Sequence, residues 1–127
     1  MPARGEGIIE VNGREIQVLF TNRAILSAEK QLNKGILGVL NGFISGESGY
    51  TDLVALLRAG MEAARQDARS GGKPVSNNDA LDVLDAIGFT AAIEPVMNAL
   101  SAAITYHAGD EDYSLSDSGD NNADPNE

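Results

Sequence analysis

The chain contains no cysteine and no tryptophan, and aromatic residues make up only 5% of its 127 residues. The absence of cysteine excludes a disulfide framework, a thiolate zinc site and a cysteine nucleophile, and it is typical of an intracellular protein. Because aromatics are scarce, the 43% of the chain that is hydrophobic is mainly aliphatic and rich in alanine. Such a core favours the packing of helix on helix, and the length is that of one domain.

Long hydrophobic runs are also absent. No stretch approaches the roughly 18 consecutive apolar residues that a membrane span needs. The opening MPARGEGIIEV has no apolar run typical of a signal peptide. The sequence therefore predicts a soluble, intracellular protein without a membrane partner.

Basic residues are few, and the net charge of −10 is concentrated near the C-terminus. Residues 110–127 contain seven acids and no base, whereas the rest of the chain is nearly balanced. Without a stripe of Lys and Arg to neutralise phosphates, we expect no nucleic-acid partner. The composition predicts a flexible N-terminus over residues 1–7, a single domain over 8–107 and a disordered acidic tail over 108–127, which has too little apolar surface to order itself.

Residues 8–20, IIEVNGREIQVLF, have the pattern of a β-hairpin. Asn12-Gly13 is the dipeptide favoured in a two-residue type I′ turn, where both central residues need positive φ. The second strand carries three apolar residues on one face: Ile16, Val18 and Phe20. A lone hairpin is marginal in water, so we expect this face to lie against helices.

Helical patterns account for most of the remaining chain. Four helices are predicted in the stretches 21–34, 50–70, 77–87 and 90–107, with a short fifth helix over 36–44. The fold class is therefore α+β and mainly α, a hairpin packed on a bundle of four to five helices.

The predicted helix ends rest on local signals. Thr21 or Asn22 caps the first helix and Gly35 ends it, while Ser76 and Asp79 form a capping box. Gly88 is expected to be a left-handed C-cap. Pro95 is expected in or just after the first turn of the last helix, where a missing N–H costs least.

The stretch GILGVLNGFISGESG, residues 35–49, contains five of the fourteen glycines. It lacks the lysine of a phosphate-binding P-loop, no G-x-G-x-x-G occurs, and its apolar run is too short for a membrane. The spacing of Gly38 and Gly42 instead predicts a packing joint, in which a neighbouring helix or hairpin approaches closely. We therefore regard five glycines as structural: Gly13, Gly35, Gly38, Gly42 and Gly88.

Catalytic and metal-binding patterns are not found in the sequence. The only histidine, His107, lies at the end of the last predicted helix, and it has no evident partner for acid–base or metal chemistry. Asp79, Asp82 and Asp85 alternate with apolar residues that place them on the solvent side. DNNAD, residues 120–124, begins like a calcium loop but lacks the required Gly and Glu. We expect no enzyme, no metal and no cofactor.

The order of elements resembles the tail assembly chaperones of long-tailed phages and gene transfer agents. The resemblance covers residues 8 to about 107. It rests on NGREIQVLFTNRAILSAEKQL with Glu29 near its end, on the connector GILGVLNGFISG, on GYTDLVALLRAGMEAAR and on DALDVLDAIGFTAAIEPVMNALSAAI. Within the third run, Asp52, Leu53, Leu56-Leu57 and Ala59-Gly60 match the run by which the family is most readily identified.

This resemblance implies a non-catalytic protein of the host cytoplasm that is absent from the mature virion. Its expected partners are the tape measure protein, a long helical chain, and the tail tube protein recruited around it. A chaperone for amphipathic helices needs an apolar groove of side chains that can repack. Residues in the helical stripes are the candidates to line it: Leu53, Leu57, Met61, Met97 and Leu100.

Two other functions stay open at this point. The same resemblance fits a structural minor tail protein of the virion, and the acidic tail fits an inhibitor that binds a host protein. The sequence also leaves open whether the chain forms a homo-oligomer, and which face binds a client.

Overall fold

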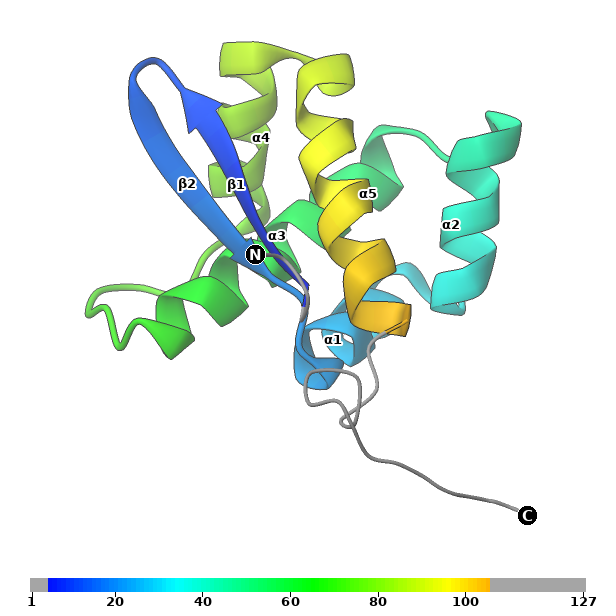
Figure 1. Ribbon diagram of the computed structural model, residues 1–127, viewed down its shortest axis with the longest axis horizontal. Coiled ribbons are helices and arrows are strands. Elements are labelled where there is room, and N and C mark those ends of the chain that lie inside the picture. The colour runs from blue at the N-terminus through cyan, green and yellow to red at the C-terminus, as the bar shows by residue number, and fades with distance from the viewer. Residues whose placement is uncertain (1–4, 106–127) are drawn as a thin grey trace, which may run out of the picture.

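The computed structural model describes residues 5–105 (Figure 1). The elements follow one another as β1 (Glu6–Val11), β2 (Arg14–Leu19), α1 (Asn22–Leu32), α2 (Ile36–Ser45), α3 (Tyr50–Asp67), α4 (Asn77–Ile87) and α5 (Phe89–Thr105). An N-terminal hairpin followed by five helices confirms the predicted α+β, mainly α class. The predicted acidic tail and His107 lie outside the described residues.

The hairpin is antiparallel and pairs Ile9 with Ile16. Asn12 and Gly13 have φ of 52° and 83°, which confirms the predicted turn with positive φ at both central residues. β1 already begins at Glu6, so the predicted flexible segment over 1–7 extended too far. Backbone pairing decides this boundary, because the carbonyl of Gly5 also accepts a hydrogen bond from the Phe20 amide.

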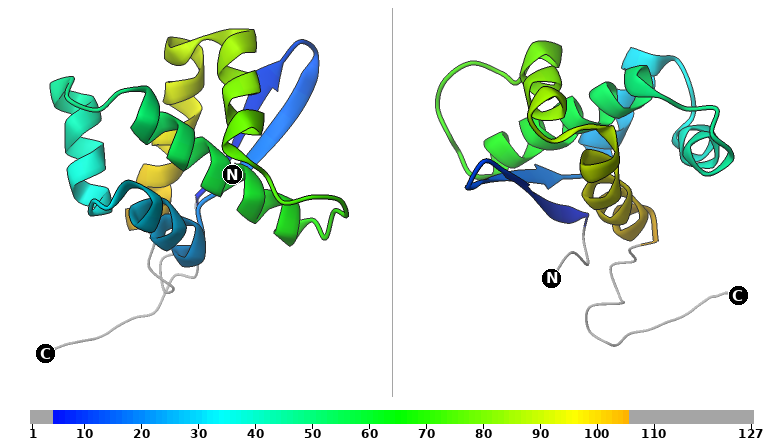
Figure 2. Two further views of the ribbon diagram at one scale, coloured as in Figure 1. Left: turned by 180° about the vertical axis from the view of Figure 1, so that it is seen from behind. Right: turned by 90° about the horizontal axis from the view of Figure 1, so that it is seen from above.

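α3 is the centre of the fold. It packs against α1, α4, α5 and β2, while α5 packs along β1 (Figures 1 and 2). Six consecutive residues of α3, Asp52 to Leu57, are buried. Over this stretch α3 is therefore enclosed on every side and not along a single face. The largest fully buried side chains come from both strands, from the residue that follows β2 and from three helices: Phe20, Ile9, Leu53, Leu56, Leu57, Leu100, Val18, Val39 and Val96.

The connection between α1 and α2 differs from the prediction at Gly35. Thr21 caps α1 as predicted, its Oγ1 accepting from the Ala24 amide at 3.0 Å. However, α1 ends at Asn33, which adopts the left-handed conformation with φ of 57°, and Gly35 is the N-cap of α2. Gly35 has no side chain with which to cap, and the carboxylate of Glu29 accepts the Ile36 amide instead, at 2.7 Å.

The packing-joint prediction is right that Gly42 is closely packed but wrong about its neighbour, and it is wrong for Gly38. Gly42 is buried, and a Cβ there would overlap Ser48 Oγ. The close neighbour is thus the following loop, whose Ser48 amide donates to the Gly42 carbonyl at 2.9 Å, and not another helix or the hairpin. Gly38 is exposed, and a Cβ there would meet nothing within 4 Å, because this side of α2 faces away from the rest of the domain.

α4 and α5 are joined by Gly88 alone. The predicted capping box of Ser76 and Asp79 is present at the start of α4. Gly88 has the expected positive φ, but its ψ of 164° is extended and not left-handed helical, because its carbonyl at once accepts the Ala92 amide of α5. Pro95 is the seventh residue of α5, one position further from its start than predicted, because α5 begins at Phe89 and not at Thr90.

Candidate partner-binding surface

Three of the five residues predicted to bind a partner are in the core. Leu53, Leu57 and Leu100 have no exposed surface. The prediction that they line a client groove is wrong, because α3 and the middle of α5 are enclosed by other elements. Their burial instead stabilises the domain.

The two methionines differ from these leucines in being only half-buried. Met61 packs against the core and lines a hollow of about 420 Å³ between the hairpin and α4, beside Arg14, Asp79 and Asp82. Met97 lies on α5 and is also partly exposed. These two side chains have solvent-accessible surface that a partner would cover, but Met97 does not line the hollow beside Met61.

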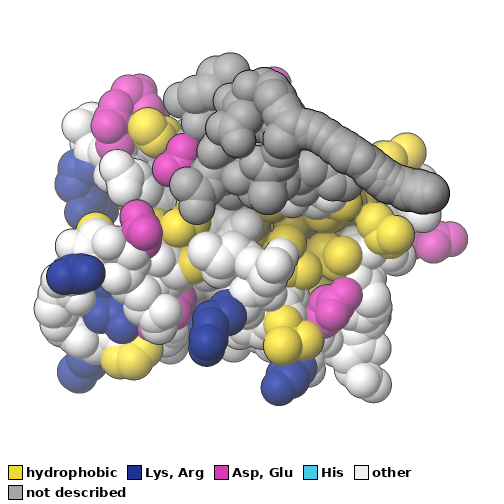
Figure 3. Space-filling model, turned by 60° about the horizontal axis from the view of Figure 1, so that its bottom comes forward, with side chains coloured by type: hydrophobic (Ala, Val, Ile, Leu, Met, Phe, Trp, Pro, Cys, Tyr) yellow, Lys and Arg dark blue, Asp and Glu magenta, His cyan; other side chains and the backbone are white. Residues whose placement is uncertain are grey.

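The large apolar side chains with the highest exposed fractions lie on α2 and at the start of α3. The sequence prediction did not select this region. Ile44 is 81% exposed, and Leu37 and Tyr50 are each 61% exposed. We call these three residues the α2 surface. Figure 3 keeps the α2 side of the molecule on the right, and hydrophobic side chains gather on that half of the view. Aromatic and large aliphatic residues of this kind dominate the energetics of protein interfaces.

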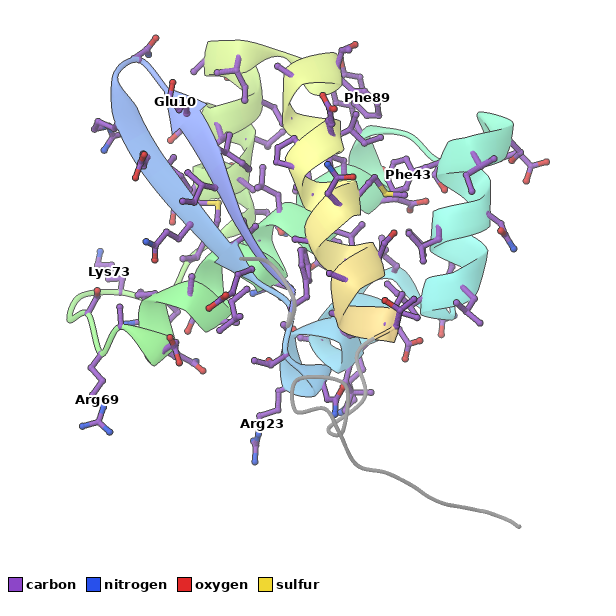
Figure 4. The ribbon with its side chains drawn as sticks, in the orientation of Figure 1. Glu10, Arg23, Phe43, Arg69, Lys73 and Phe89 are labelled. Carbon is purple, nitrogen blue, oxygen red and sulfur yellow. The ribbon has the colours of Figure 1, made fainter. Side chains whose placement is uncertain are left out.

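Aromatic rings link the α2 surface to α5. The ring centroids of Tyr50 and Phe89 are 4.9 Å apart in an edge-to-face arrangement, and those of Phe43 and Phe89 are 6.4 Å apart. Phe43 and Phe89 extend toward the space between α2 and α5 (Figure 4). Edge-to-face pairs of this kind stabilise packing beyond the area they bury. They fix the orientation of the exposed Tyr50 ring.

The sequence of α2 by itself predicts burial and not exposure. α2, ILGVLNGFIS, has apolar residues on all sides and no charge. A helix of that composition is expected to be buried all round. Here it packs mainly on one side, so the apolar side chains that point outward have few neighbours among residues 5–105.

The region around α2 is held by one ion pair. Asp52, buried in the first turn of α3, accepts from Lys34 Nζ at 3.1 Å through both carboxylate oxygens. The carboxylate also lies at the positive end of the α3 dipole. This contact fixes the loop after α1 against α3. The ion pair has a structural role, because the Asp52 carboxylate is almost wholly buried and a ligand could not reach it.

A second ion pair holds the C-terminal part of α3. Arg65 donates to both oxygens of Glu62, at 2.9 and 2.8 Å, and the Val75 amide donates to the same carboxylate. Hydrogen bonds from Arg65 lower the pKa of Glu62 from 4.5 to about 2, and those from Val75 and Gln66 act in the same direction. Glu62 therefore ties α3 to the segment that leads into α4.

Basic side chains line an open groove between α1 and α3, with a volume of about 920 Å³. Arg23 and Lys30 come from α1 and Arg58 from α3, and Leu26 is half-exposed among them. Arg23 extends away from the body of the domain (Figure 4). Within residues 5–105 no carboxylate forms an ion pair with these three cations.

Asp79, Asp82 and Asp85 are all exposed, as predicted. Over residues 5–105, no three side chains of His, Cys, Asp or Glu gather as a metal site requires. In the same range, no helix combines the length and apolar character needed to cross a membrane.

Comparison with known proteins gives no match: no family model fits the chain, and no curated protein or solved structure is significantly similar to it.

Proposed function

We propose that this protein is a tail assembly chaperone. It acts in the host cytoplasm, binds the tape measure protein, helps to recruit the tail tube protein, and is absent from the finished virion. The observation that carries the proposal is the order of hairpin, α1, short uncharged α2 and long central α3, over which the resembling runs are distributed. The run TDLVALLRAG occupies the first half of α3.

The α2 surface supports a role in binding apolar helices. It offers Leu37, Ile44 and Tyr50 on one side of the domain, far from the hairpin (Figure 2). A client helix that laid its apolar face here would cover side chains that the chain itself leaves exposed. This surface replaces the buried leucines as the proposed client site.

Co-expression with the tape measure protein of the same tail gene cluster tests the proposal. The wild-type chain should raise the soluble yield of that partner and co-purify with it. The double variant L37S/I44S should lose both effects, because it removes most of the exposed aliphatic area of the α2 surface. Circular dichroism should show that its fold and melting temperature stay close to wild type.

The matched control is I8S, which removes a 51%-exposed isoleucine from the hairpin. It should retain full chaperone effect. If the wild-type chain neither raises the yield nor co-purifies, the proposed function is wrong. Mass spectrometry of purified particles decides between chaperone and minor tail protein, since only the latter is present in virions.

A further inference from the structure

The groove between α1 and α3 is positively charged on a strongly acidic chain. Its cations are Arg23, Lys30 and Arg58. Two acids also line it, Glu62 and Asp67. Since Glu62 is already neutralised by Arg65, the groove retains excess positive charge, although the chain has a net charge of −10.

Arg58 is held on the wall of the groove by two neutral hydrogen-bond partners. Its Nε donates to Gln31 Oε1 at 3.0 Å, and one terminal nitrogen donates to Ser27 Oγ at 2.7 Å. Both partners are neutral, and they hold the guanidinium in one orientation on the wall of the groove. Guanidinium groups bind carboxylates preferentially, through paired N–H donors.

We propose that this groove binds the chain's own segment 110–117, DEDYSLSD. The segment carries four acids, Asp110, Glu111, Asp112 and Asp117, around two apolar residues, Tyr113 and Leu115. This pattern complements a groove in which exposed Leu26 lies among three cations. The proposal does not depend on the chaperone function.

The end of α5 places this segment within reach of the groove. A Cβ built on Gly5 would lie 2.8 Å from Ala103 Cβ and 2.9 Å from the Phe20 carbonyl oxygen, so the last turns of α5 lie beside the residue that precedes the Thr21 cap of α1. Eight extended residues, from Thr105 to Tyr113, span up to about 28 Å, and an 11-residue helix such as α1 is only about 16 Å long.

Tethering makes the weak contacts effective. Each ion pair at an exposed site contributes little by itself. Because the segment is attached to the same chain, however, its effective concentration at the groove is in the range of about millimolar. An acidic external partner of this groove must therefore displace the segment first.

Paramagnetic relaxation on the full-length chain tests the proposal. The chain has no cysteine, so S116C provides a single site for a nitroxide label. The amide signals of α1 and of residues 58–67 should lose most of their intensity, whereas those of α2 and α4 should not. Raising the ionic strength from about 0.05 M to about 0.5 M should restore them, because the Debye length falls to a few ångströms.

Two charge variants provide the matched comparison. R23E/K30E should abolish the broadening. R69E/K73E makes the same change in charge on the loop after α3 (Figure 4), at two residues that do not line the groove, and should leave the broadening intact. Broadening that is equal in both variants, that survives high salt, or that grows with protein concentration overturns docking of the segment on its own chain.

Discussion

α2 and α3 are both apolar helices of one small domain, yet one is enclosed and the other is exposed. α3 has residues 52–57 buried on every side. α2 carries no charge at all but leaves Ile44 81% exposed and Leu37 61% exposed. The difference lies in their neighbours, since α3 packs against three helices and β2, whereas α2 packs mainly against α1. Apolar composition alone therefore does not determine whether a helix is buried.

The largest expected effect comes from truncating a leucine on each helix. L57A on α3 should lower the free energy of unfolding by about 2–5 kcal/mol, because it opens a cavity in a fully enclosed core. L37A on α2 should change it by no more than about 0.5 kcal/mol, since that side chain is mainly in solvent. Urea denaturation of the two variants measures both values.

A loss of more than about 2 kcal/mol for L37A would contradict the comparison. It would mean that the outer side of α2 is covered in solution, as it would be in a homo-oligomer. Repeating the denaturation at several protein concentrations identifies that case.

Glycine-to-alanine substitutions give a smaller effect of opposite sign on the two helices. A Cβ on Gly60 of α3 would lie 3.0 Å from both Phe20 Cζ and Val18 Cβ, two side chains that are buried and have little room to move. G60A should therefore destabilise the domain by about 1–2 kcal/mol. G38A on α2 meets open space and should stabilise it by up to about 1 kcal/mol, because alanine favours the helix.

Thermal melts of G60A and G38A measure the two changes in stability directly. Equal shifts of the melting temperature in the same direction would show that α2 and α3 are not packed differently at these positions.

The smallest effect concerns pH and the C-terminal part of α3. Arg65 lowers the pKa of Glu62 to about 2, below the 4.5 of the unfolded chain. Glu62 therefore contributes stability that is fully present above pH 4.5 and is lost as the pH falls toward 2. The difference in unfolding free energy between wild type and E62Q should be constant near neutral pH and should shrink over this window.

The control for this titration is E47Q, an exposed glutamate in the loop between α2 and α3. The difference in unfolding free energy between wild type and E47Q should be near zero over the whole pH range. A difference for E62Q that does not change between pH 5 and pH 2 would contradict the assignment of the low pKa to Glu62.

The features that could be predicted from the sequence are those that depend on neighbours along the chain. The Asn12-Gly13 turn, the Thr21 cap and the box of Ser76 and Asp79 each involve residues no more than three apart, and all three predictions are confirmed. Gly35 was assigned to the wrong helix end because Asn33 supplies the left-handed residue two positions earlier. Both residue types can adopt that conformation, so the local signal was ambiguous.

The candidate site was predicted poorly because helical periodicity identifies an apolar face without saying what covers it. Leu53, Leu57 and Leu100 have the same pattern whether they line a groove or the core, and they are in the core. Gly38 has the spacing of a close-packed position, yet no element approaches it. The absence of charge from the whole of α2 predicts burial on all sides, so it did not identify the exposed surface either.

The sequence by itself determined the order and type of the elements, the hairpin turn and most helix caps, because each depends on dihedral preferences and hydrogen bonds within a few residues. Only the tertiary structure decided which apolar residues are enclosed. It placed α3 among four neighbours, turned Leu37 and Ile44 to solvent, and brought Arg58 beside Arg23 and Lys30. Burial and the clustering of charge depend on segments that are distant in the chain, and no local pattern specifies which segments will meet.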